Sequence, residues 1–160
     1  DWEDATGPAA ARAIRVVNLR FGLILSAGGG ALAKLLLPFK LGVGGRLGSG
    51  KQYWSWIAID DVVGAIRHVL SSQSVNGPVN IVGPNAVTNN EFTNVLGKIL
   101  ARPTIFPAPA FALRLALGEM ADALLLSSAR IYPKKLLDSH YRFQYTNLDQ
   151  AFYHLLNRKP

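Results

Sequence analysis

Cysteine is absent from the 160-residue sequence, which excludes disulfides, thiolate zinc sites and cysteine nucleophiles. Acidic residues are scarce, because ten Asp and Glu stand against seventeen Lys and Arg, for a formal charge of +7. A long uncharged apolar run is also missing. The most apolar stretch, Ala108 to Leu126, contains Arg114, Glu119 and Asp122, and each of these charges would be costly in lipid. We therefore expect no membrane span.

The first residues are not expected to be a signal peptide, since Asp1-Trp2-Glu3-Asp4 has neither a basic n-region nor an apolar h-region. It also lacks an initiating methionine, so we expect the sequence to begin inside a longer protein, within a helix already under way. About half of the residues are apolar, as in a compact globular domain. The lack of cysteine fits a reducing compartment. The expected location is the cytoplasm or, alternatively, the plastid stroma.

The positive charge raises the alternative of a nucleic-acid-binding module. The basic residues are scattered singly, however, and only Lys134-Lys135 and Arg158-Lys159 are adjacent. Because no basic stripe with interleaved aromatic residues is present, a nucleic-acid partner is not expected.

The chain alternates strand and helix patterns, which favours an α/β fold. Ile14 to Gly22 is β-branched and almost continuously apolar, as in a strand buried on both faces. Further strands are expected over Gln52 to Ile59 and over Val79 to Val82. Helices are expected over Glu3 to Ala13, over Ala31 to Pro38, where the proline stops the helix, over Val62 to Leu70, and from the Thr88-x-x-Glu91 capping box to Leu100. Beyond these we expect one or two helices over Phe111 to Leu126, a helical turn over Pro133 to Leu137 and a helix over Leu148 to Asn157 capped by Asn147.

Two glycine patterns suggest nucleotide binding and fall short of it. Gly45 to Lys51 matches the first part of a P-loop, but the next residue is Gln52 instead of Ser or Thr, and the loop leads into a strand. The dinucleotide fingerprint fails as well, because Leu47 stands where the third glycine would be. This chain is therefore not expected to cradle a pyrophosphate by itself.

Other candidate groups are better explained as structural. Asp60 and Asp61 could be paired catalytic carboxylates, but neighbours on a helix point about 100° apart, so capping is the better account. The three histidines are far apart in the sequence, and no strained nucleophile turn is present. Trp54 and Trp56 face the same side of their strand, where they either stack on a ligand or fill a core. We predict no catalytic residue and no metal ligand in this chain.

Three landmarks then occur in order: Arg15 to Gly22 followed by Gly28-Gly29-Gly30, the glycine loop from Pro38 to Gln52, and Ser55 to Asp61. With Val79 to Pro84 and the tail from Arg102, they resemble the second half of an atypical group of extended short-chain dehydrogenases/reductases. This group is labelled NAD-dependent epimerase/dehydratase-like, and some members are labelled cell division inhibitor.

The resemblance implies the carboxyl-terminal part of a Rossmann-like fold. Residues 1–101 would end the sheet and supply cleft loops, and residues 102–160 would form a helical subdomain. It implies NAD or NADP as the cofactor of the parent protein, with Phe21, Gly22 and Leu23 beside the nicotinamide. The substrate cleft would be lined by Ser26, Gly28, Gly29, Gly30, Gln52, Trp54, Trp56 and Asn80.

The Tyr-x-x-x-Lys proton-transfer pair of such enzymes is absent from the sequence, so the chain alone is expected to be catalytically incomplete. Nucleotide-sugar epimerases place a diphosphate-binding arginine where Trp54 stands, which puts that substrate class in doubt. The expected partners are the missing amino-terminal half, an unknown small-molecule substrate and, by resemblance, a second copy in a homodimer. The alternative function is a non-enzymatic regulator of cell division that retains the fold.

Overall fold

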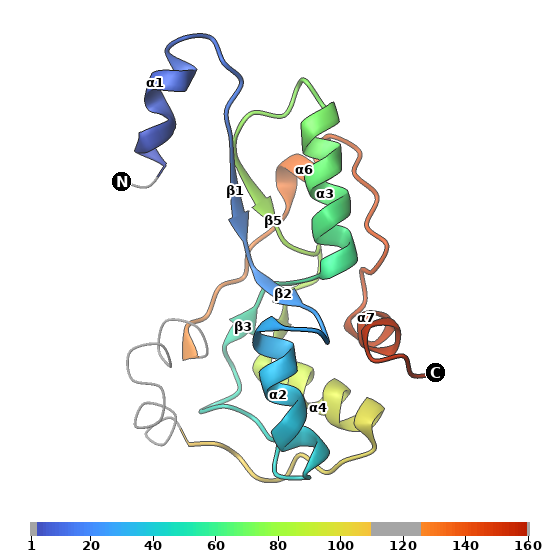
Figure 1. Ribbon diagram of the computed structural model, residues 1–160. Coiled ribbons are helices and arrows are strands. Elements are labelled where there is room, and N and C mark those ends of the chain that lie inside the picture. Colours follow the sequence, from blue (N-terminus) through green and yellow to red (C-terminus); the bar gives the residue numbers. More distant parts are fainter. Residues whose placement is uncertain (1–2, 110–125, 160) are drawn as a thin grey trace.

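The computed structural model describes residues 3–109 and 126–159, and Figure 1 shows their arrangement. The elements in chain order are η1 (Asp4–Thr6), α1 (Gly7–Ala10), β1 (Val17–Phe21), β2 (Leu23–Leu25), α2 (Gly30–Lys40), β3 (Tyr53–Trp54), β4 (Trp56–Ala58), α3 (Ile59–Ser71), β5 (Gly77–Ile81), β6 (Val87–Thr88), α4 (Asn89–Leu100), α6 (Lys134–Asp138) and α7 (Leu148–Leu155). Strand β1 pairs in parallel with β5, and β2 pairs in parallel with β4, while β3 and β6 are antiparallel. Parallel pairs joined through helices confirm the predicted α/β class.

Strands β1 and β2 form one line that changes partner at Gly22. The Gly22 amide donates to the Ile81 carbonyl on β5 at 3.3 Å, and the next amide, Leu23, donates to the Ser55 carbonyl at 2.8 Å. The Gly83 amide in turn donates to the Trp56 carbonyl at 2.7 Å, so β4 lies between β2 and the continuation of β5. A single residue thus marks the point where the sheet divides.

Two hydrophobic cores flank this point, one in the upper and one in the lower part of Figure 1. The upper core contains Ile57, Val62, Ala65, Val69, Val75, Val79, Ile81 and Leu136. The lower core contains Leu25, Leu32, Leu36, Phe39, Leu47, Trp54, Trp56, Ala58, Phe92, Leu96, Leu100, Leu148, Ala151 and Phe152. Ile57 and its neighbours Trp56 and Ala58 point to different cores, as alternate residues of a strand do. Strand β4 therefore joins the two parts.

Two expected elements differ from the structure. Pro38 lies inside α2 instead of ending it, because only its own missing amide is lost and the Leu41 amide still donates to the Leu37 carbonyl at 3.1 Å. The strand expected over Gln52 to Ile59 is interrupted at Ser55, and its two pieces pair with different strands.

The helix boundaries show further differences. The expected first helix is reduced to η1 and α1, and Ala13 follows them with a left-handed φ of 57°. The capping box at Thr88 is confirmed, since the Thr88 and Glu91 groups bond reciprocally. Asn147 is the N-cap residue of α7, as predicted, but its side chain makes no capping hydrogen bond. The helices expected over 111–126 lie almost wholly outside the described residues.

Membrane-spanning length is not reached by any helix within residues 3–109 and 126–159. The proposed division at residue 101 stays a prediction. Segments beyond it do return to the earlier part, because α6 packs on β5 and α7 packs on α4.

The division of the sheet at Gly22 predicts a large cost for a methyl group there. A Cβ on Gly22 would lie 2.3 Å from the Ser55 carbonyl oxygen and 2.7 Å from Val82 Cγ1. We expect Gly22→Ala to lower the free energy of unfolding by about 1–3 kcal/mol, as overpacking does. Gly7→Ala is the control, because that position is helical and a Cβ there would meet nothing within 4 Å. Urea unfolding measures the stability of both variants. Equal unfolding midpoints for Gly22→Ala and Gly7→Ala would show that Gly22 is not crowded as described.

Candidate functional site

Four of the predicted site residues meet where the sheet divides. Phe21 ends β1 with 47% of its surface exposed, and Gly22 and Leu23 follow it directly. The register of β1 on β5 puts Arg20 beside Asn80 and Phe21 beside Ile81, so Asn80 is one position from Phe21 across the pair. The Asn80 amide nitrogen donates to the Tyr132 carbonyl at 3.3 Å. The residues predicted beside a nicotinamide therefore share one end of β1 with Asn80.

A glycine-rich turn continues from this point into α2. Ser26 follows Leu25, which pairs with Ala58 at the start of α3. The Ser26 hydroxyl accepts from the Gly28 amide at 3.3 Å, and Gly30 has a left-handed φ of 69°. A Cβ on Gly29 would meet nothing within 4 Å. The backbone of this turn can therefore be approached closely by a ligand.

The predicted residues Gln52, Trp54 and Trp56 lie in the interior. Both indoles belong to the lower core, which is the packing role that the sequence left open. The Gln52 amide nitrogen donates to the Leu47 carbonyl at 2.9 Å, and the Leu47 amide donates to Asn89 Oδ1 at 2.8 Å. These two contacts hold the glycine loop against α4. Substrate contact by Gln52, Trp54 and Trp56 remains a prediction.

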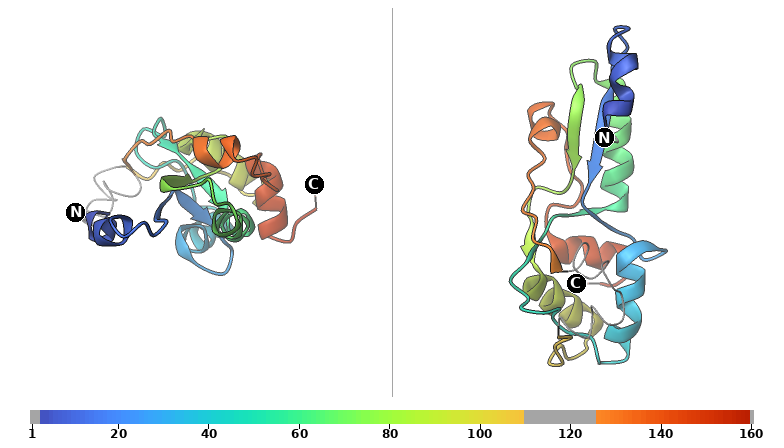
Figure 2. Two further views of the ribbon diagram at one scale, coloured as in Figure 1. Left: turned by 90° about the horizontal axis from the view of Figure 1, so that it is seen from above. Right: turned by 90° about the vertical axis from the view of Figure 1, so that its left-hand side faces the viewer.

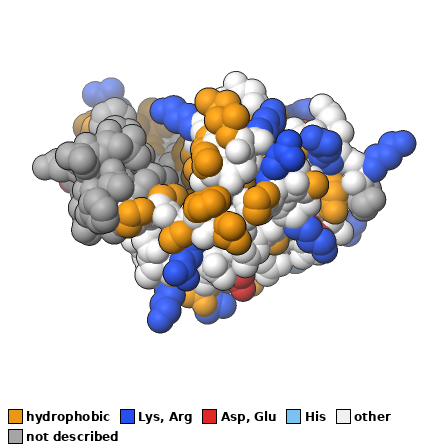
Figure 3. All heavy atoms as spheres, turned by 90° about the horizontal axis from the view of Figure 1, so that it is seen from below, with side chains coloured by type: hydrophobic (Ala, Val, Ile, Leu, Met, Phe, Trp, Pro, Cys, Tyr) orange, Lys and Arg blue, Asp and Glu red, His pale blue; other side chains and the backbone are white. Residues whose placement is uncertain are grey.

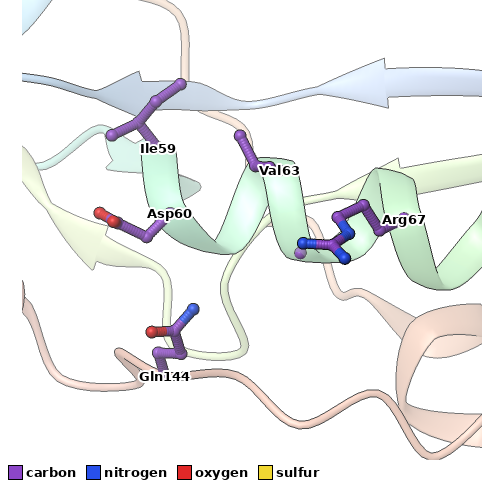
Figure 4. Close-up of a pocket in the computed structure, with 6 residues that line it drawn as sticks. Ile59, Asp60, Val63, Arg67 and Gln144 are labelled. Carbon is purple, nitrogen blue, oxygen red and sulfur yellow. The ribbon is translucent and has the colours of Figure 1, made fainter.

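A surface pocket of about 300 Å³ lies on the outer face of α3, and none of the predicted site residues lines it. Figure 4 shows the labelled α3 side chains with Gln144 approaching from the segment that precedes α7. The lining residues are Ile59, Asp60, Val63, Gly64, Arg67 and Gln144. Sequence reasoning missed this pocket because Gln144 comes from a distant segment. The only sequence signal was the spacing of Asp60, Val63 and Arg67 along one helix face.

Asp61 fixes the position of Gln144, and its role differs from the predicted helix cap. The N-cap residue of α3 is Ala58, and no side chain caps the helix. The fully buried Asp61 carboxylate instead accepts from the Gln144 amide at 2.7 Å and the Tyr145 amide at 2.9 Å. It also accepts from the Tyr141 hydroxyl at 3.1 Å, which shares its proton with the Asp61 backbone carbonyl at 3.0 Å. Three donors compensate the burial of this charge. Asp61 therefore attaches the carboxyl-terminal segment to α3.

Asp60 makes a weaker contact with the same segment. Its carboxylate lies 3.2 Å from His154 Nε2, and both side chains are partly exposed. The His154 ring stacks on Tyr145 with a centroid distance of 4.7 Å. The two aspartates therefore act separately, as expected for adjacent residues on a helix.

A serine–histidine contact elsewhere lacks the geometry of a nucleophile and base. His68 Nε2 lies 2.8 Å from the Ser139 hydroxyl oxygen. That hydroxyl donates its own proton to the Leu136 carbonyl at 3.0 Å, so the histidine is the donor in this contact. Within the described ranges no group of three or more His, Cys, Asp or Glu residues is placed to hold a metal ion.

The fold geometry is shared with solved proteins. The Thermus thermophilus UDP-glucose 4-epimerase superposes on 92% of the chain and 47% of its own, with a TM-score of 0.64 at 15% identity, which shows the fold alone. Human epimerase family protein SDR39U1, solved with NADPH, covers 97% of this chain and 54% of its own, with a TM-score of 0.87 at 34% identity. The class is therefore an α/β, Rossmann-like fold of the epimerase type.

Sequence comparison identifies the relatives within this class. An epimerase family protein of Mycobacterium tuberculosis is 42% identical over 151 residues, which are 94% of this chain and 50% of that protein. The family model described as "Domain of unknown function (DUF1731)" matches residues 108–155. The chain spans about half the length of the curated relatives it matches. It resembles the epimerase family over nearly all of its residues, and it fits the carboxyl-terminal part of an extended short-chain dehydrogenase/reductase.

The attachment through Asp61 predicts a large difference between two adjacent aspartates. Asp61→Asn places an amide among three donors, so we expect a loss of about 2–3 kcal/mol in unfolding free energy. Asp60→Asn is the matched control, with an expected loss below about 1 kcal/mol, because its carboxylate is partly exposed. Thermal and urea unfolding of both variants measure the difference. Equal losses would show that the buried carboxylate does not hold the segment.

The same network predicts a pH dependence. Burial, followed by the nearby Asp61 carboxylate, raises the pKa of Tyr141 above its ordinary value. A raised folded pKa contributes stability that is complete below about pH 10 and is lost as the pH rises through the folded pKa. The stability advantage of wild type over Tyr141→Phe should therefore shrink as the pH rises from about 10 to about 12. An advantage that stays constant in urea titrations across this range would contradict the assignment.

Proposed function

We propose that the chain forms the substrate-binding part of an NAD(P)-dependent oxidoreductase or epimerase-like protein. In this proposal it supplies one wall of the cleft and the surface next to the nicotinamide. The dinucleotide-phosphate cradle and the proton-transfer pair come from the remaining half of the protein. The chain alone then has no catalytic activity.

The observation that carries this proposal is the unpaired edge of β1. Among the described residues, β1 pairs only with β5, so its other edge presents amide and carbonyl groups without a strand partner. A pocket of about 190 Å³ lies beside it, between β1 and α3. Its lining is mostly apolar: Arg15, Val17, Leu19, Ile66, Val69 and Leu70. A further strand with its covering helix would satisfy the edge and bury this groove.

The length of the relatives supports the same proposal, because they are about twice as long as the region that matches this chain. The half of the protein that they imply is the proposed partner of the β1 edge. A homodimer and a cytoplasmic or plastid-stromal location are further parts of the proposal.

The residues present fit the nicotinamide end of a dinucleotide. Phe21 offers a half-exposed aromatic ring at the carboxyl end of β1, which suits a flat and weakly polar ring. The turn at Gly28 and Gly29 leaves space at the backbone for a substrate. The NADPH in the human relative favours this cofactor class. When bound, the cofactor would supply hydride transfer, and this chain would position it and exclude water.

Residues of the cleft wall have different proposed roles. We assign direct substrate contact to Ser26 and the glycine turn, and a neighbouring role to Asn80, which already bonds the Tyr132 carbonyl. Gln52, Trp54 and Trp56 would act from behind the cleft by holding the glycine loop and the lower core.

NADPH fluorescence tests the proposal. The chain alone should bind NADPH with a Kd above about 100 μM, and its fusion behind the amino-terminal half of the M. tuberculosis relative should bind at least about tenfold more tightly. Phe21→Ala should weaken binding by the fusion about fivefold or more, by loss of aromatic contact. Ile105→Ala, which removes an exposed apolar side chain far from β1, should leave binding unchanged.

Two outcomes would contradict the proposal. Micromolar binding of NADPH by the chain alone would show that the cradle lies within it. A folded fusion that does not bind NADPH would instead favour the regulator of cell division as the function that retains this fold.

A further inference from the structure

Exposed apolar side chains gather at the lower end of the molecule, away from β1. Figure 3 views this end from below and shows apolar groups in the middle of the face with basic groups around them. Ile105 is 73% exposed and Leu41 is 69% exposed, and they belong to a group of exposed apolar side chains, which is more informative than single ones. The set, here called the tip patch, consists of Leu37, Leu41, Val43, Ile105 and Phe106.

The tip patch is held as one surface by backbone contacts between two segments. Gly45 pairs with Ile105 as an isolated β-bridge, and a Cβ on Gly45 would overlap the Phe106 carbonyl. Arg102 Nε donates to the Lys40 carbonyl at 2.9 Å, which attaches the second segment to the end of α2. The apolar side chains are therefore presented by packed backbone.

The two stretches of chain that carry the tip patch are almost entirely basic in their charged residues. Residues 22–58 and 89–109 contain a single carboxylate, Glu91. That carboxylate accepts from the Thr88 amide and hydroxyl, and the backbone hydrogen bond lowers the pKa of Glu91. The same two stretches contain six basic residues, all exposed: Lys34, Lys40, Arg46, Lys51, Lys98 and Arg102. These basic residues would therefore attract an anionic surface, and little negative charge on the same two stretches would oppose that attraction.

The tip patch lies at the end of the described chain away from β1. Figures 1 and 2 place β1 and α1 at one end of the molecule and the loops after α2 and α4 at the other. A strand added at β1 would extend the sheet at the first end. The groove beside β1 and the tip patch are therefore separate surfaces.

We propose that the tip patch docks on the surface of an anionic lipid bilayer. Apolar side chains among Lys and Arg suit the boundary between acyl chains and anionic headgroups, where long basic side chains keep their charges in the headgroup layer. A second copy of the chain fits less well, because the same cations would face one another. Lysine is also depleted at protein–protein interfaces, whereas four of the six basic residues are lysines.

Co-sedimentation with vesicles tests this inference on the whole chain. We expect binding to phosphatidylglycerol–phosphatidylcholine vesicles, weaker binding in high salt, and little binding to phosphatidylcholine alone. The double variant Ile105→Ser, Phe106→Ser should lower partitioning at least about tenfold. Lys40→Gln and Lys51→Gln should each lower it about fivefold. Ile14→Ser and Lys159→Gln remove an exposed apolar side chain and a lysine elsewhere, so both variants should bind as wild type does.

Circular dichroism verifies that each variant is folded before its binding is compared. Equal binding to neutral and anionic vesicles, absence of binding, or unchanged binding by the tip-patch variants would overturn the inference. A dimer in sedimentation equilibrium that Phe106→Ser dissociates would also overturn it, because the tip patch would then be an interface between two copies. None of these results depends on NADPH. Failure of the membrane inference can therefore be distinguished from failure of the proposed function, which NADPH binding tests.

Discussion

The division of the sheet at Gly22 is the constraint on which the rest of the structure depends. Two consecutive amides, those of Gly22 and Leu23, donate to different strands, and the Ser55 carbonyl occupies the space that a Cβ would need. This crowding places β4 between two diverging strands and lets it contribute to both cores. It also directs β2 onto β4, so that Leu25, just before the glycine turn, pairs with Ala58 at the start of α3.

The second determinant is the buried charge of Asp61. A carboxylate without donors would be costly in the interior, whereas three donors from residues 141–145 convert the same group into a specific attachment. The carboxyl-terminal segment thereby crosses α3 at a fixed register and delivers Gln144 to the pocket and α7 to the lower core. One buried side chain thus links α3 to the carboxyl-terminal segment.

Local patterns predicted what depends on local contacts. The capping box at Thr88 and the apolar strand leading to Phe21 follow from neighbouring residues, and both are present. The interruption at Ser55 could not be predicted in this way. The interruption depends on the Leu23 amide, which donates to the Ser55 carbonyl, and on the Ile131 amide, which donates to the Ser55 hydroxyl at 2.8 Å. For the same reason the local pattern predicts a helix cap at Asp61, whereas the donors to its carboxylate lie some eighty residues further along the chain. The cleft residues were predicted from the family resemblance alone, and the structure adds that two of them, Trp54 and Trp56, are buried in the lower core.

The central claim is that β1 is an inner strand with one neighbour supplied from outside this chain, and amide hydrogen exchange tests it most directly. The bonds from Gly22 to Ile81 and from Gly77 to Val16 direct the even-numbered amides of β1 toward β5, so the odd-numbered ones face the unpaired edge. In the chain alone, Asn18 and Arg20 should be protected while Leu19 and Phe21 exchange rapidly, and fusion to the amino-terminal half of a relative should protect all four. Equal protection of the four amides in the chain alone would contradict the account.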